Sequence, residues 1–255
     1  MSHAFTGIHL LTKCAACAAP LAHDAPRCVR CKTRYCNKTC QHDHWRRGHK
    51  QMCKKIHRGG NAEQYHADKK YKEALAVAVE ACAADAKGQT CYICLEAVHP
   101  STGEGLVRGC GCQGNQGFLH VSCLVRRDEI LMDEAKDRVF ATWDFEATIS
   151  NMKDAEKIAK GMLSCKLCKK RYDAKILRAL GWGCWKRCAS KSEQRWSAGS
   201  DEHTQITGAL TNLGGCLSES GQQAEAKQVD QALQLAFPSD WLMNMNSLIN
   251  SHRSK

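Results

Sequence analysis

Four short pairs of metal-ligand residues decide the fold at the start of this chain: CAAC (14–17), CVRC (28–31), CNKTC (36–40) and HKQMC (49–53). The first two have the C-x2-C spacing, at which a tight turn brings two thiolates to one metal ion. The ligands of the last two pairs are four residues apart, so on a helix both members lie on one face. The pattern predicts two closed zinc sites of four ligands each. The ligands are Cys14, Cys17, Cys28, Cys31, Cys36, Cys40, His49 and Cys53.

Disulfide bonds are the alternative use of so many cysteines. Residues 1–13 contain no apolar run long enough for a secretory signal, and no later stretch reaches membrane-spanning length. We therefore expect an intracellular protein of the cytosol or nucleus, without membrane contact. Clustered cysteines in a reducing compartment bind metal rather than form bridges, which favours zinc.

The order C-x2-C, x10, C-x2-C, x4, C-x3-C, x8, H-x3-C resembles the MYND zinc finger, with Tyr35 and Trp45 where that family usually has aromatic residues. The resemblance implies that the pairs interleave, the first and third holding one zinc and the second and fourth the other. It also implies a protein-interaction module and not a catalyst. Several members of the family bind short proline-containing peptides.

The positive charge of the chain is concentrated in this segment. Residues 1–60 contain 12 Lys/Arg against Asp24 and Asp43, a net charge of +10, whereas the other 195 residues have a net charge of +1. Seven thiolates and two zinc ions would leave about +7 on the finger. An acidic protein or a nucleic acid would be attracted to such a surface. The simpler reading, that these side chains only solvate a finger with little core, stays open.

A second block of ligand pairs begins with CYIC (91–94) and continues with CGC (110–112), HVSC (120–123) and CKLC (165–168). Glycines flank the C-x-C pair, so an extended loop can bring both thiolates to one ion. This block predicts two more zinc ions, four per chain in all. Its ligands are Cys91, Cys94, Cys110, Cys112, His120, Cys123, Cys165 and Cys168.

The ligand order of the second block resembles a RING-CH finger, the RING variant with cysteine fourth and histidine fifth. The resemblance implies that its first and third pairs share one zinc and its second and fourth pairs the other. The 41 residues between Cys123 and Cys165 exceed the usual gap of the family. Their charged, helical pattern indicates an inserted helix or hairpin at 124–164, within which Trp143 is a candidate for a family tryptophan.

RING-CH domains are typically ubiquitin ligases that bind a charged conjugating enzyme, on which the chemistry takes place. By resemblance, Ile93 is in the position of a docking aliphatic residue and Lys169 in that of a cationic residue contacting ubiquitin. The simpler readings are a packing residue and an ordinary surface lysine. Neither finger offers an open metal position, so we expect structural zinc and no catalytic residue.

The remaining segments read as helical. Residues 61–86 have apolar positions at three- and four-residue steps, typical of an amphipathic connector, or of a degraded tetratricopeptide hairpin. Around Trp182 and Trp185 we expect a core against the second finger, and we expect Cys82, Cys184 and Cys188 to be buried thiols rather than ligands. Residues 211–238 resemble one tetratricopeptide repeat, which cannot bury its own apolar face alone.

We therefore expect a zinc-stapled, multi-domain α+β protein whose two cross-brace double-zinc fingers are joined by helical hairpins, with a mostly helical C-terminal half. The expected domains are 1–57, 58–88, 89–188, a linker at 189–204, and 205–255. The leading function is a ubiquitin ligase or ligase subunit whose second finger (91–168) recruits the conjugating enzyme. The first finger (14–53) would then hold a short peptide or acidic protein. The alternatives are a non-catalytic adaptor and, less favoured, a nucleic-acid-binding regulator. No stretch is left for a SET methyltransferase domain.

Overall fold

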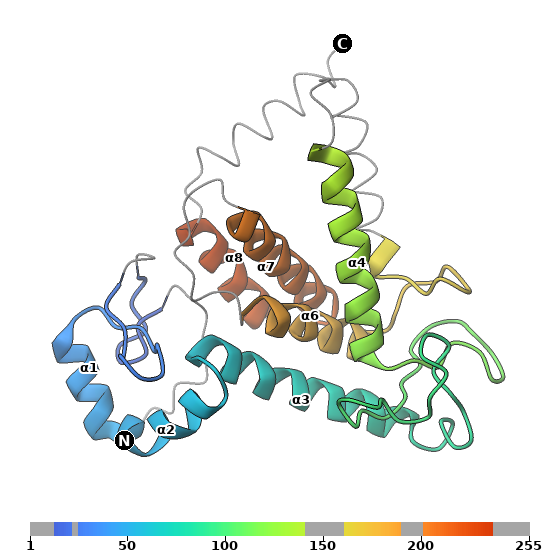
Figure 1. Cartoon of the computed structure of the whole chain (residues 1–255), viewed down its shortest axis with the longest axis horizontal. Coiled ribbons are helices and arrows are strands. Elements are labelled where there is room, and N and C mark those ends of the chain that lie inside the picture. Colours follow the sequence, from blue (N-terminus) through green and yellow to red (C-terminus); the bar gives the residue numbers. More distant parts are fainter. Residues whose placement is uncertain (1–12, 22–24, 141–160, 190–200, 237–255) are drawn as a thin grey trace, which may run out of the picture. The chain divides into compact units, whose positions relative to one another are not determined.

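The computed structural model describes residues 13–21, 25–140, 161–189 and 201–236 (Figure 1). Helices dominate these ranges: α1 (Lys38–His44), η1 (Trp45–His49), α2 (Lys50–Arg58), α3 (Ala62–Cys82), α4 (Val121–Phe140), α6 (Ala174–Ala189), α7 (Asp201–Glu219) and α8 (Gln223–Ala236). Trp143 and residues 237–255, at the end of the expected last domain, lie outside the described residues. No helix in the described ranges is both long and apolar enough to cross a bilayer.

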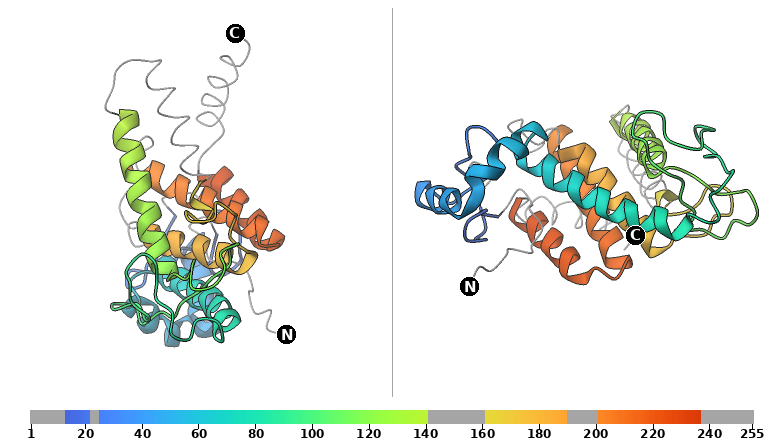
Figure 2. Two further views of the ribbon diagram at one scale, coloured as in Figure 1. Left: turned by 90° about the vertical axis from the view of Figure 1, so that its right-hand side faces the viewer. Right: turned by 90° about the horizontal axis from the view of Figure 1, so that it is seen from below.

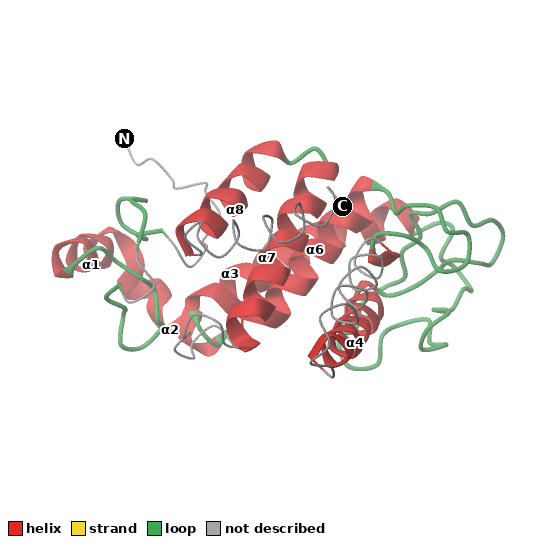
Figure 3. Cartoon of the chain, turned by 90° about the horizontal axis from the view of Figure 1, so that it is seen from above, coloured by secondary structure: helices red, strands yellow, loops and turns green. Residues whose placement is uncertain are grey.

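The expected α+β class needs a correction, because the described residues contain almost no β-structure (Figure 3). Extended backbone pairs there only as isolated bridges: Lys13 with Pro20, Arg27 with Arg34, Val107 with Leu119, and Ser164 with Arg171. Three of these bridges close the arms of C-x2-C turns. Each turn is completed by its cysteine pair and two backbone hydrogen bonds. The arms on either side are therefore too short to form a ladder of paired strands.

Two compact units divide the chain. The first comprises the described parts of 1–69, 185–218 and 222–255, and the second comprises those of 70–184 and 219–221. This division does not test the domain boundaries expected from the sequence, which stay predictions. Residues 62–82 form one continuous helix, α3, rather than a hairpin.

The core of the first finger is small and consists largely of cysteines. Tyr35 is the largest side chain fully buried in it, and Ile56 of α2 and Leu21 pack beside it. So little apolar surface cannot stabilise some forty residues alone. The fold of this segment therefore depends on cross-links between its cysteines, which metal ions would supply.

Asn61 connects two helices within the first unit. Its Oδ1 accepts the N–H of Gln64 at 2.8 Å, which caps the start of α3. Its Nδ2 donates to the carbonyl of Ala189, in the last turn of α6, at 3.2 Å. Asn61 is buried, so both contacts are shielded from water.

The helices α7 and α8 form a hairpin (Figure 3), and the short connection between them contains Gly221. Gly221 has φ +78°, a left-handed conformation that glycine adopts without strain. Leu210, Leu213 and Leu217 are buried on α7, and a Cβ at Gly214 would lie 3.4 Å from Val229 of α8. The hairpin agrees with one helical repeat in outline, but the tetratricopeptide resemblance itself stays a proposal.

In the second unit, the second finger surrounds the C-terminal part of α3 and the start of α4 (Figure 2). Ala74, Ala78 and Cys82 form the buried face of α3 there. A Cβ at Gly183 of α6 would lie 2.7 Å from Val125 of α4, so these helices pack closely. Leu177, Leu180 and Trp182 are buried in this unit, and Trp185, with which the α6 part of the first unit begins, is buried as well.

Candidate zinc centres

Each of the four C-x2-C pairs closes the same turn. The N–H of the residue after the second cysteine donates to the carbonyl of the first cysteine at 2.8–2.9 Å. The N–H of the first cysteine donates to the carbonyl five residues further on at 2.7–3.0 Å. The residues after the second cysteines are all left-handed, with φ from +60° to +67°: Ala18, Lys32, Leu95 and Lys169. This repeated turn aims both sulfurs of a pair at one point.

The four turns and four further pairs combine into four ligand groups. Within each group, the ligand atoms lie within 4.8 Å of one another. In both fingers the first pair combines with the third and the second with the fourth. The groups are Cys14, Cys17, Cys36 and Cys40; Cys28, Cys31, His49 and Cys53; Cys91, Cys94, His120 and Cys123; and Cys110, Cys112, Cys165 and Cys168. They contain the sixteen residues singled out in the sequence.

The sulfur separations fit tetrahedral zinc. Zn–S bonds of about 2.3 Å place two sulfurs of a tetrahedron about 3.8 Å apart, whereas a disulfide requires about 2.05 Å. The sulfur of Cys17 lies 3.6 Å from that of Cys36 and 3.9 Å from that of Cys40. Cys28 and Cys53 lie 3.7 Å apart. All eighteen cysteines are free, so the groups are ligand sets without bridges, consistent with zinc binding.

The two histidine ligands face their groups through different nitrogens. Nε2 of His49 lies 3.3 Å from the sulfur of Cys31, and Nδ1 of His120 lies 3.3 Å from that of Cys94. Nδ1 of His49 is buried and has no hydrogen-bond partner among the described residues. Burial lowers the pKa of both imidazoles, which favours the neutral form that binds metal.

Backbone amides prepare some of the thiols for metal binding. Burial acts to raise the pKa of the Cys14 thiol, but N–H groups of Cys17, Ala16 and Cys36 point at its sulfur and bring the pKa down to about 7. The N–H of Lys170 is the main cause that lowers the pKa of Cys168 to about 7. Both thiols therefore ionise readily, as a zinc ligand must.

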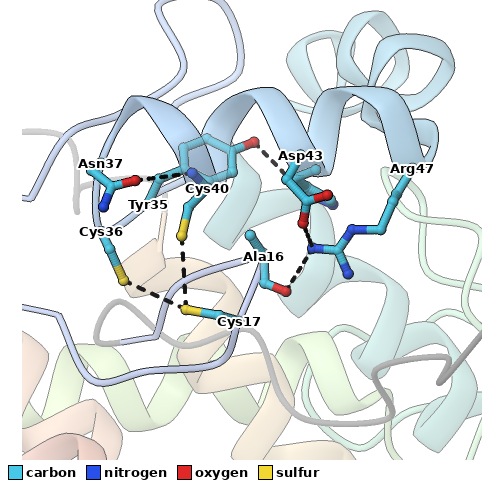
Figure 4. Close-up of polar contacts among 9 residues, drawn as sticks. Ala16, Cys17, Tyr35, Cys36, Asn37, Cys40, Asp43 and Arg47 are labelled. Atoms are coloured by element: carbon cyan, nitrogen blue, oxygen red, sulfur yellow. Dashed lines mark hydrogen bonds and ion pairs between the residues drawn. The ribbon is translucent and has the colours of Figure 1, made fainter.

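Residues around the first finger hold its ligands in place (Figure 4). Asn37 caps α1, and its Oδ1 accepts the N–H of Cys40 at 3.0 Å. Nη2 of Arg47 donates to the carbonyl of Ala16 at 2.8 Å and pairs with Asp43 at 2.5 Å. Arg47 thus links the first C-x2-C turn to the helix that carries Cys40.

A kink between α1 and α2 orients His49. Gly48 has φ +127°, which side-chain-bearing residues rarely adopt. His49 follows it and stacks on His44 with ring centroids 4.8 Å apart, and the hydroxyl of Tyr35 lies 3.0 Å from Nδ1 of His44. Trp45 meets His49 edge-on at 5.9 Å. Both aromatic residues noted in the sequence therefore belong to the surroundings of His49.

In the second finger, Glu104 positions the helix that carries Cys123. Its Oε2 accepts the N–H of Ser122 in the first turn of α4 at 3.0 Å, and its Oε1 accepts the hydroxyl of Tyr71 at 2.7 Å. Glu104 is buried, yet no spacing rule in the sequence points to it. The partners of Glu104, Arg47 and Asn37 become evident only once the chain is folded.

Close contacts at Gly117 shape the C-x-C loop. A Cβ at Gly117 would lie 2.7 Å from Cβ of Cys112 and 3.1 Å from the sulfur of Cys110. Gly117 also has φ +82°, so a larger residue would be strained and would press on both ligands. The other conspicuous cysteines stand apart: Cys82 is buried, as expected, and contacts the backbone of Arg108. Cys184 and Cys188 belong to none of the described groups, but they are only partly buried, so the expectation of buried thiols was wrong for these two.

Ile93 and Lys169 lie on the surface of the second finger's turns. Ile93 is 37% exposed, and the apolar Leu95 and Leu167 nearby in the two turns are 73% and 49% exposed. Lys169 is exposed and has the left-handed backbone of its turn. These positions make the side chains accessible, but their roles stay proposals.

The family profile of the MYND finger matches residues 13–53. Residues 13–53 form a MYND finger. The match spans the first two ligand groups and ends at Cys53. Searches among curated proteins and among solved structures gave no match. MYND fingers bind zinc and generally mediate protein–protein interactions, so the match suggests a zinc-binding, protein-interaction role for residues 13–53.

Proposed function

We propose that this protein is a RING-CH-type ubiquitin ligase or ligase subunit, whose MYND finger recruits a protein partner. The observation that carries the proposal is the interleaving of the second finger. Cys91 and Cys94 share a group with His120 and Cys123, while the C-x-C pair reaches across the long insertion to Cys165 and Cys168. This cross-brace with cysteine fourth and histidine fifth is the order that resembles RING-CH.

The chemistry of such a ligase takes place on the bound conjugating enzyme. In this chain, each candidate zinc group has four protein ligands, so a bound zinc ion would be structural and would not activate water. The protein would contribute a docking surface. Ile93, Leu95 and Leu167 are apolar and exposed on the turns, and an apolar surface of this kind favours protein docking.

Lys169 is the proposed cationic contact to ubiquitin. It is adjacent to Cys168, so its backbone is fixed by the turn, while its side chain is exposed. Because φ is +60°, replacement by glycine removes the charge without backbone strain. Arginine at the same position would keep the charge.

Discharge of ubiquitin from a panel of conjugating enzymes tests the proposal. We expect the zinc-loaded full chain to accelerate discharge for at least one enzyme, and Ile93→Ala to abolish the acceleration. Lys169→Gly is expected to slow discharge about tenfold, with Lys169→Arg close to wild type. Val98→Ala is the matched control, since Val98 is 59% exposed in the same finger but lies outside the turns. If the chain accelerates discharge from none of the conjugating enzymes in a broad panel, the ligase proposal is wrong.

The alternative function is a non-catalytic adaptor. It is favoured by α4, which continues to Phe140 inside the long gap between Cys123 and Cys165 and is a candidate for covering a docking surface. Under this alternative both fingers bind proteins and no discharge occurs. Discharge that depends on Ile93 would exclude it.

A further inference from the structure

The helix α2 of the MYND finger presents an almost wholly cationic face to solvent. Lys50, Lys54 and Arg58 follow one another at four-residue steps, so they lie along one side of the helix. Lys55 extends the same exposed face, and only Cys53 and Ile56 of this helix are buried. None of the four cations has an ion-pair partner among the described residues.

The cations of this face repel one another, since like charges four residues apart on a helix are destabilising. Lys50 at the start of α2 also opposes the helix dipole, whereas Lys55 and Arg58 in the last turn are favoured by it. The described part of the finger contains one acidic residue, Asp43, which is paired with Arg47. The described part of the finger therefore holds no acidic side chain free to neutralise this face, which fits a surface that meets an external anion.

An apolar side chain borders the cationic face. Met52 is 40% exposed and is located one turn before Lys55 and beside the buried side of the helix. A flexible thioether at the edge of a charged surface can pack against an aliphatic residue of a partner. The face thus combines charge attraction with one apolar contact, as protein interfaces often do.

We propose that α2 docks an acidic segment of a partner protein, with carboxylates at about four-residue spacing and an aliphatic residue that covers Met52. Nucleic acid is the other polyanion to consider. Three of the four cations are lysines, and α2 contains no Phe, Tyr or Trp on which a base could stack. A protein segment therefore fits the face better. This inference rests on the proposed recruiting role of the MYND finger and not on ligase activity.

Fluorescence anisotropy with the zinc-loaded full chain tests the proposal at about 150 mM salt, where distant charges are screened. The probe is a 16-residue labelled peptide with Asp or Glu at every fourth position and a central leucine. Two comparison probes are used: the same peptide with amides in place of carboxylates, and a 20-base-pair DNA duplex. The test variant is Lys50→Glu with Lys54→Glu. The matched control is Lys175→Glu with Lys227→Glu, which changes the net charge equally at exposed positions without ion pairs among the described residues.

We expect the acidic peptide to bind wild type and the control variant within a factor of two, and the α2 variant at least tenfold more weakly. The amide peptide should not bind, and Met52→Ser should weaken binding about threefold. Zinc content of each variant, by native mass spectrometry, shows that the finger is intact. No binding of the acidic peptide, equal loss in both charge variants, or tighter binding of the DNA would each overturn the proposal. Ubiquitin discharge measures the function of the second finger, whereas peptide binding measures the function of α2. Either proposal can therefore fail while the other stands.

Discussion

The sulfur of Cys112 lies 3.7 Å from the sulfur of Cys165, although 53 residues separate them in sequence. That distance fits two ligands of one tetrahedral zinc ion. The long insertion between Cys123 and Cys165 therefore does not displace the last ligand pair. We expect Cys165→Ser to lose zinc from the second finger while the MYND finger keeps its two ions, because the fingers share no ligand.

Native mass spectrometry of Cys165→Ser would show the lower zinc content. Cys188→Ser is the matched control, since Cys188 is a partly buried cysteine of α6 outside the described groups. Equal zinc content in both variants would contradict the role of Cys165.

Arg47 should stabilise the MYND-finger ligand group that contains Cys14, Cys17, Cys36 and Cys40. Arg47→Met removes the hydrogen bond to Ala16 and the pair with Asp43, so the first turn is held less firmly. These contacts are exposed, and we expect an effect of about 1 kcal/mol or less. Zinc release to a chelator should become about two- to fivefold faster for one of the two ions of the MYND finger. Arg46→Met, at a neighbouring exposed position, should release zinc like the wild type.

The left-handed residues of the four turns carry backbone strain. Leu95 has φ +67° and is 73% exposed, so Leu95→Gly should relieve strain while losing little packing. We expect a gain of about 1 kcal/mol in the free energy of unfolding, and a loss of similar size for the β-branched Leu95→Val. Urea unfolding at buffered free zinc measures both. A glycine variant less stable than the valine variant would contradict the turn geometry.

Glu63 should make the stability of the first unit depend on pH. Burial raises the pKa of this carboxyl to about 7, although Arg34 and Arg27 act to lower it. The folded state then binds a proton that the unfolded state, with its ordinary pKa, releases. The contribution of this carboxyl to stability therefore increases as the pH falls through about 7 toward the ordinary pKa. The contribution is lost again when the pH rises above about 7.

Glu63→Gln removes this titration and leaves the ligand residues in place. Between pH 8 and pH 6, the free energy of unfolding of wild type should rise relative to the variant by about 1 kcal/mol. Taking the difference cancels the proton competition at the thiolates, which both proteins share. A constant difference across this range would show that Glu63 does not titrate there.

The zinc-binding part of the fold could be predicted because ligand spacing is a local property of the chain. A C-x2-C pair specifies its own turn, and two such turns leave few ways to complete a tetrahedron. The supporting contacts could not be predicted in the same way. Glu104 forms hydrogen bonds with Tyr71 and Ser122 only after α3 and α4 are packed, and no pattern in the sequence predicts these contacts.

The strand content was overestimated for a related reason. The expected α+β class implied strands, but each C-x2-C turn occupies most of the residues of its arms and leaves a single bridge, such as that between Lys13 and Pro20. The helical face of α3 was predictable, because Tyr71, Ala74 and Ala78 recur at helical spacing and are buried together. The surface that covers the α7–α8 hairpin could not be predicted, because its sequence specifies its own apolar face and not what packs on it.

Zinc stoichiometry tests the central claim most directly. Native mass spectrometry of the full chain, before and after chelation, should show four zinc ions per chain and none after chelation, accompanied by loss of helical circular dichroism. Four ions would match the four ligand groups with zinc in each. A chain that binds only two ions at saturating zinc would contradict the account, because one of the two fingers would then not be a double-zinc site.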